Sequence, residues 1–171
     1  MRKLLLPAML AGVFAPPAQA ADLALTVNIP RLDVAEYHRP YVAIWVENTD
    51  HTAAADLAVW YDVAKKNNEG TKWLKDIRQW WRRSGRDQSF PVDGVSGATR
   101  APGKHDLNLN DSAKQLADLK PGHYAVVIEA AREVGDRELV RIPFDWPPTK
   151  AAHLDASGQH ELGTIDLQLN P

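Results

Sequence analysis

Several segments of this chain alternate between apolar and polar residues, which is the pattern of a β-strand with one buried face. In the first segment, at 23–29, Leu, Leu, Val and Ile occupy every second position. Similar short runs, separated by turn-forming residues, occur at 41–46, 56–61, 105–109, 123–131, 139–144 and 161–169. In the run at 56–61 we expect Leu57, Val59 and Tyr61 to share one face. The pattern predicts a chain built mainly from strands.

The spacing of apolar residues changes to a helical period after the third run. The residues that recur at this period are Trp73, Ile77, Trp80 and Trp81, while Lys and Arg fill the remaining face. Thr71 is expected to cap the start of the helix and Gly85 to end it. We predict an amphipathic helix at about 72–83 that packs Trp73, Ile77 and one of the two adjacent tryptophans on a sheet.

Seven or so short strands, with turns between them and a single helix, are typical of a β-sandwich. The fold class that we predict is mainly β, an immunoglobulin-like antiparallel β-sandwich with one inserted amphipathic helix. Pro147 and Pro148 should end the strand before them. We expect the segment at 151–160 to be a mobile loop.

The first 20 residues have the order of parts found in a secretory signal peptide. Arg2 and Lys3 give a basic start, an apolar stretch follows at 4–14, and Ala18-Gln19-Ala20 is a cleavage signal. The alternative, an N-terminal helix of the mature fold, is opposed by the two prolines before that signal. We predict cleavage after Ala20, which leaves 21–171 as one periplasmic β-sandwich domain.

The composition narrows the classes of function. The chain has 20 Lys and Arg, 22 Asp and Glu, and no cysteine. Without Arg2 and Lys3, 18 basic and 22 acidic residues leave a net charge of −4. The chain therefore lacks the excess of positive charge that is typical of a nucleic-acid-binding protein. No second long apolar run is present, so we expect a soluble mature protein without membrane insertion. Thiol redox chemistry is excluded, and an electron carrier of this composition needs a bound cofactor.

The segment at 93–99 concentrates small and hydroxylated residues. Its sequence is Asp93-Gly94-Val95-Ser96-Gly97-Ala98-Thr99. Small residues allow a large molecule to approach the backbone, although such a cluster also serves as a plain turn between strands. Gly94-Val95-Ser96-Gly97-Ala98 approximates the nucleophile elbow of a serine hydrolase, but the Pro and Gly that follow cannot continue the helix which that elbow requires.

The pattern Asp93-x-x-Ser96-Gly97-Ala98-Thr99 resembles the acceptor motif of proteins that carry FMN covalently, such as FMN-binding domains of sodium-pumping and electron-bifurcating membrane complexes. In that family an extracytoplasmic flavin transferase takes FMN from FAD and links its phosphate to the hydroxyl of the final Thr. The resemblance implies a phosphoester at Thr99. It implies that Ser96, Gly97 and Ala98 form a small platform and that Asp93 opens the motif.

Three longer stretches, 39–47, 72–83 and 96–103, are similar to a family of small periplasmic proteins encoded beside PepSY-type membrane proteins. The resemblance covers most of 22–146 and implies a flavinylated periplasmic electron carrier. Its expected partners are the flavin transferase and a PepSY-type inner-membrane redox protein.

Other residues are candidates for contact with the flavin. Trp80 and Trp81 could stack on the ring, and the alternative for each is core packing. Arg100, which follows Thr99, could hold the phosphate. Further candidates for phosphate contact or for docking an acidic partner are Arg78, Arg82, Arg83 and Arg86, with a solvated helix face as the alternative. The six His residues show no metal-binding spacing, so we expect no metal site.

The sequence thus favours a periplasmic electron-transfer flavoprotein with FMN on Thr99. It would relay electrons with a PepSY-type partner, in reduction of iron or other metal complexes. It would be a redox carrier rather than an enzyme with its own substrate pocket. The alternative is an unmodified immunoglobulin-like binding module for a metal complex or a partner protein.

Overall fold

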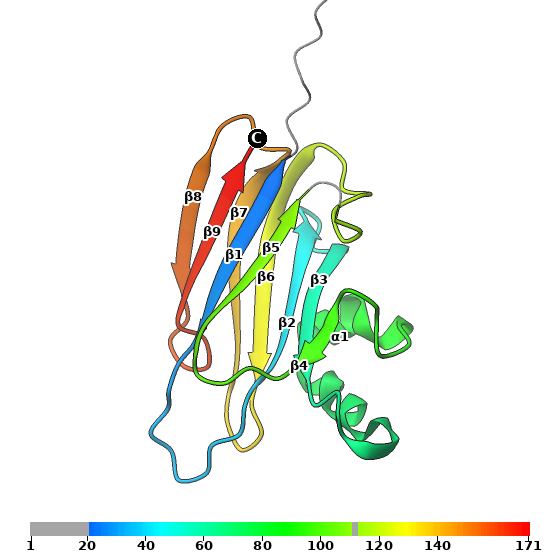
Figure 1. Ribbon diagram of the computed structural model, residues 1–171, viewed down its shortest axis with the longest axis vertical. Coiled ribbons are helices and arrows are strands. Elements are labelled where there is room, and N and C mark those ends of the chain that lie inside the picture. The colour runs from blue at the N-terminus through cyan, green and yellow to red at the C-terminus, as the bar shows by residue number, and fades with distance from the viewer. Residues whose placement is uncertain (1–20, 111–112) are drawn as a thin grey trace, which may run out of the picture.

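The computed structural model describes residues 21–110 and 113–171, so the predicted signal peptide lies outside the described residues (Figure 1). The described strands form two sheets. One sheet has the order β5 (Gly103–Asn110), β1 (Asp22–Ile29), β9 (Thr164–Asn170), β8 (Ala152–Ser157). The other has the order β4 (Ser96–Ala98), β3 (Ala53–Tyr61), β2 (Tyr41–Asn48), β6 (Gly122–Ala131), β7 (Arg137–Trp146).

The two sheets enclose a single apolar core, which confirms the predicted β-sandwich. Every second residue of β1 points into it, because side chains alternate between the two faces of a strand. Inward residues of the five-stranded sheet complete the core; they include Val42, Ile44, Val46, Val126, Ile128, Ala130, Ile142 and Phe144. The described strand pairs are antiparallel except β3 with β4, which is parallel.

A second apolar cluster lies on the outer face of the five-stranded sheet. The insertion between β3 and β4 covers this face with η1 (Lys66–Asp76), α1 (Arg78–Arg83) and η2 (Gly85–Asp87) (Figure 1). The fold is therefore a sandwich with a third, helical layer. Strands β2 and β6 are buried on both faces, which explains their nearly continuous apolar sequences.

The predicted helix at 72–83 is wrong in its bounds, because the insertion is mostly 3₁₀ and only 78–83 is α-helical. Asn67 and Asn68 have positive φ angles and interrupt η1, a conformation that asparagine tolerates better than most residues. Thr71 does not cap the helix; its hydroxyl donates to the Asn68 carbonyl at 2.7 Å. Gly85 begins η2 and packs against the Trp80 ring.

The predicted packing of this segment is right for two of its three apolar anchors. Ile77 and Trp80 are fully buried, as predicted. Trp73 is wrong as a core residue, since 49% of its surface is exposed. The indole N–H of Trp80 donates to Asp56 at 2.7 Å, so this side chain is anchored by a polar contact as well as by packing.

Two further expectations are corrected by the structure. Leu57 does not share a face with Val59 and Tyr61, because the β2–β3 register shifts between Ile44 and Trp45. Such a bulge turns the residues before it to the opposite face. The segment at 151–160 is not simply a loop, since β8 pairs with β9 along its length.

Glu138 fixes the connection between β8 and β9. Its carboxylate accepts the backbone N–H groups of residues 159–162. Burial acts to raise the pKa of this carboxyl, but the four donors outweigh it and hold the pKa below its ordinary value. Because the pKa is lower in the folded protein, the charged carboxylate stabilises the fold at pH values above its unfolded-state pKa of about 4.3. This stabilisation is lost as the pH falls from there through the lower pKa of the folded state.

Glu138→Gln is therefore expected to be less stable than the wild type at neutral pH, with the difference narrowing as the pH falls below about 4.3. The midpoint of urea unfolding, measured from pH 7 to pH 3, tests this. Parallel pH profiles for the two proteins would show that Glu138 contributes no pH-dependent stability.

Candidate functional site

The motif 93–99 lies at the edge of the five-stranded sheet, as β4 and the turn before it. Strand β4 pairs with β3, and the pairing continues on both sides through Val59 N–H to the Val95 carbonyl at 2.9 Å and Thr99 N–H to the Tyr61 carbonyl at 3.2 Å. Thr99 is thus held by its backbone where β3 ends, and its side chain is half-buried.

Within the motif, Ser96 and Gly94 shape the turn. The Ser96 hydroxyl accepts the Val92 N–H at 2.9 Å. Gly94 has a φ of 73°, in the left-handed region that favours glycine, and its carbonyl accepts the Gln115 side-chain N–H at 2.6 Å. Asp93 is exposed and has no hydrogen bond or ion pair with another described residue. Its carboxylate is accessible to a modifying enzyme.

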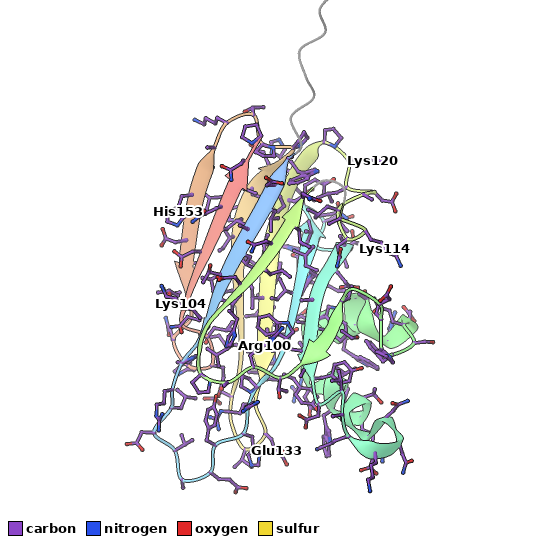
Figure 2. The ribbon with its side chains drawn as sticks, viewed as in Figure 1. Arg100, Lys104, Lys114, Lys120, Glu133 and His153 are labelled. Atoms are coloured by element: carbon purple, nitrogen blue, oxygen red, sulfur yellow. The ribbon has the colours of Figure 1, made fainter. Side chains whose placement is uncertain are left out.

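Gly97 and Arg100 pack over Trp60. A Cβ on Gly97 would lie 3.5 Å from the Trp60 ring, an ordinary contact, and Gly97 does not have a positive φ. The guanidinium of Arg100 lies 5.2 Å from the Trp60 ring centre, within the range of a cation–π contact. Figure 2 shows Arg100 on the connection that leads from β4 to β5. Both residues therefore help to cover the edge of the inter-sheet core.

Ser96 does not have the setting of a hydrolase nucleophile. Its hydroxyl is engaged with the backbone of its own turn. The motif continues into β5, whereas the nucleophile elbow joins a strand to a helix in an α/β sheet.

Thr99 lines a pocket of about 630 Å³ at one end of the sandwich. The walls come from 37–41 at the start of β2, from 62–78 after β3, and from 131–137, which are the turn between β6 and β7 and the strand residue on each side of it. Figure 2 shows Glu133, in that turn, at the opposite end of the molecule from Lys120. Three segments that are distant in sequence thus meet beside Thr99, the residue that ends the motif.

The pocket combines aromatic rings with charged residues of both signs, the acidic ones being Asp62, Asp76, Glu133 and Asp136. Tyr37, Tyr41 and Trp73 belong to its lining. Burial raises the pKa of Tyr41 to about 12, so its hydroxyl stays protonated and donates to the Gly70 carbonyl at 3.2 Å. Burial also raises the pKa of Tyr37, whose hydroxyl has no hydrogen-bond partner among the described residues.

The cations of the lining fall into two groups. Lys65, Arg132 and Arg137 form ion pairs with Asp62, Glu161 and Glu129, at 3.3, 2.8 and 2.8 Å. Arg39 and Arg78 have no ion-pair partner in the described part of the chain. These two guanidinium groups are therefore available to an anionic ligand.

The structure places the other predicted contacts outside this pocket. Trp80 is fully buried, and Trp81 stacks on Phe90 with ring centres 6.4 Å apart. Neither of them lines the pocket with Thr99, and neither does Arg100. Sequence analysis did not identify Arg39, Tyr37 or the exposed position of Trp73. The Asn67-Asn68 pair was the available signal that the helical period would break before Trp73.

The exposed large apolar side chains lie at this end of the sandwich. Four large apolar side chains are exposed in the described residues, and all lie in its connections: Val34, Val63, Trp73 and Val134. Two of the four, Trp73 and Val134, belong to the lining of the pocket. Three or more His, Cys, Asp or Glu in a metal-binding arrangement do not occur within 21–110 and 113–171.

The chain matches the family model described as Predicted periplasmic protein (DUF2271) over residues 22–164. It belongs to this family. The matched residues include β1 to β8, the whole insertion and the residues that line the pocket. The family description agrees with the periplasmic location predicted from the sequence. No curated protein and no solved structure matches the chain.

Among the described residues, no helix has the length and apolar character needed to cross a bilayer. The predicted cleavage after Ala20 falls at the edge of the described residues and stays a prediction.

Proposed function

We propose that this protein is a periplasmic electron-transfer flavoprotein that carries FMN in phosphoester linkage to Thr99. The observation that carries the proposal is the position of the motif's final hydroxyl. Thr99, which carries this hydroxyl, lines a pocket with aromatic rings and two guanidinium groups that have no ion-pair partner among the described residues. The resemblance of 93–99 to covalent FMN acceptors, stated above, supplies the chemistry.

The residues around Thr99 fit such a group. A volume of about 630 Å³ lies within the range of about 300–1,000 Å³ that is usual for pockets holding small molecules and cofactors. Ser96, Gly97 and Ala98 are small, so a bulky donor can approach the hydroxyl from the exposed edge of the sheet. The Thr99 hydroxyl has no hydrogen bond with another described residue and can react without disrupting the fold.

The attachment is a transfer of FMN from FAD. The Thr99 oxygen forms a bond to the phosphorus of the FMN half, the pyrophosphate bond of FAD breaks, and AMP leaves. The hydroxyl proton passes to a base of the transferase, so the protein gains FMN less one water. Bound FMN supplies reversible uptake and release of electrons, which this cysteine-free chain cannot provide from its own side chains.

The partner in electron transfer is proposed to be a PepSY-type inner-membrane redox protein, and the acceptors to be iron or other metal complexes. Docking is expected at the pocket end, because the exposed apolar side chains gather there and electron transfer requires a short distance to the flavin. Transient redox complexes need only a small interface, so a few exposed residues suffice.

The test is export of the full chain in cells that contain a flavin transferase active on a known acceptor. The intact mass of the periplasmic protein is expected to exceed that of protein made without the transferase by FMN less one water. The bound flavin should lose its yellow colour with dithionite and regain it with a ferric complex. An unmodified protein, in cells where the known acceptor is fully modified, would overturn the proposal and favour the unmodified binding module.

A further inference from the structure

Trp73 places a large ring on the pocket wall without a ring contact to any described aromatic residue. Half of its surface is exposed, whereas Trp80 is fully buried and Trp81 is stacked on Phe90. A Trp ring stabilises a protein or a complex by burying a large apolar surface. A Trp ring left half-exposed at a pocket therefore indicates a surface that receives a planar ligand.

The backbone that carries Trp73 is firmly attached to the sheet. The next residue, Leu74, and Ile77 are fully buried in the outer apolar cluster. Gly70 lies so close to the backbone of Asp62 that a Cβ there would be 2.2 Å from its carbonyl oxygen. Tyr41 bonds the Gly70 carbonyl from the sheet. The position of Trp73 is therefore set by the fold even though its ring is exposed.

The distances along the sheet suit a ligand that begins at Thr99. Neighbouring strands are about 4.8 Å apart, so the pocket wall from β4 to the start of β7 extends for about 19 Å. Trp73 and Arg78 lie on the insertion above this edge, and Arg39 precedes β2 in the middle of the sheet. A ligand anchored at one end can place a ring system against the wall and near both cations.

We propose that the flavin ring carried on Thr99 rests against Trp73, and that Arg39 and Arg78 provide positive charge that favours its reduction. Trp73 takes the role for which the sequence made Trp80 and Trp81 candidates. The inference deepens the proposed function and rests on it, because it requires FMN at Thr99.

The test compares flavinylated wild-type protein with flavinylated Trp73→Leu at equal flavin content, checked by intact mass. An indole stacked on a flavin quenches the flavin emission, so Trp73→Leu is expected to raise the emission severalfold. The matched control is Trp81→Leu, which removes a half-buried indole outside the pocket and should leave the emission unchanged. Because Trp73 is exposed, its replacement should preserve the fold.

Equal emission from wild type and Trp73→Leu would overturn this inference while leaving covalent FMN intact. A rise with Trp81→Leu instead would move the stacking contact to that residue and equally overturn it. Failure of the proposed function has a different signature, since no variant would then gain the mass of FMN.

The proposed effect of the two arginine charges is tested by measuring the reduction potential of the bound flavin. Arg78→Gln and Arg39→Gln should each shift the midpoint potential to a more negative value, because each removes a positive charge beside a group that gains electrons. Arg82→Gln is the control: it lies on the same helix and is exposed, but it does not line the pocket. If the midpoint potentials of all three variants equal that of the wild type, the proposed role of the two arginines is excluded.

Discussion

Thr99→Val is expected to abolish the attachment of FMN and to leave the fold unchanged. Valine keeps the branched shape of threonine but has no hydroxyl to form the phosphoester. The Thr99 hydroxyl has no hydrogen bond with the described residues, and the backbone bond from Thr99 to Tyr61 remains. We expect the free energy of unfolding to change by no more than about 0.5 kcal/mol. Intact mass after coexpression with the transferase and urea unfolding measure the two effects.

Two further variants test whether the Thr99 hydroxyl oxygen is the atom that forms the phosphoester. Thr99→Ser keeps a hydroxyl and should retain some modification. Ser96→Ala removes the acceptor of the Val92 N–H and should cost about 1 kcal/mol of stability while FMN is still attached. Flavin that persists on Thr99→Val, or that is lost only with Ser96→Ala, would place the phosphoester elsewhere in the motif.

The sandwich could be predicted because its strands follow local rules. In β1 every second residue is apolar and buried, and β6 and β7 read as a hairpin around the turn at 132–136. The predicted face of Leu57 was wrong because a bulge depends on the register with a neighbouring strand. No period within one strand can show that shift.

The candidate site could be predicted only in part, for the same physical reason. The motif at 93–99 is contiguous, so its residues could be named from the sequence. The pocket is formed by three connections that the sheet order β4-β3-β2-β6-β7 brings to one end, and this order is a property of the whole fold. Helical spacing assigned Trp73 to the core, but the 3₁₀ geometry of η1 turns it outward.

Glu129→Ala is expected to reduce the free energy of unfolding by about 2–4 kcal/mol, because two backbone N–H groups at the start of α1 lose a charged acceptor. The Glu129 carboxylate is completely buried on β6. It accepts the backbone N–H groups of Gln79 and Trp80 at 2.9 Å, and Arg137 pairs with it at 2.8 Å. Alanine would leave the buried Trp80 N–H and the half-buried Gln79 N–H without an acceptor, whereas Arg137, whose side chain is 37% exposed, can be solvated.

The effect should centre on the insertion, and hence on the pocket. An isolated helix of six residues such as α1 is not stable in water, so α1 depends on this carboxylate and on the burial of Trp80. Arg78 begins the same helix and lines the pocket, so Glu129→Ala should also disturb that wall. Urea unfolding gives the stability, and near-UV circular dichroism reports the packing of Trp80.

The matched control for Glu129→Ala is Glu69→Ala. Glu69 belongs to the same insertion, but its carboxylate is exposed and pairs with Lys72 at 3.3 Å. A solvated pair of this kind contributes at most about 1 kcal/mol. Similar losses in the two variants would contradict the anchoring role of Glu129. A loss confined to Glu129→Ala, with a weakened Trp80 signal, would show that one buried carboxylate attaches the helical layer, and with it the Arg78 wall, to the sheet.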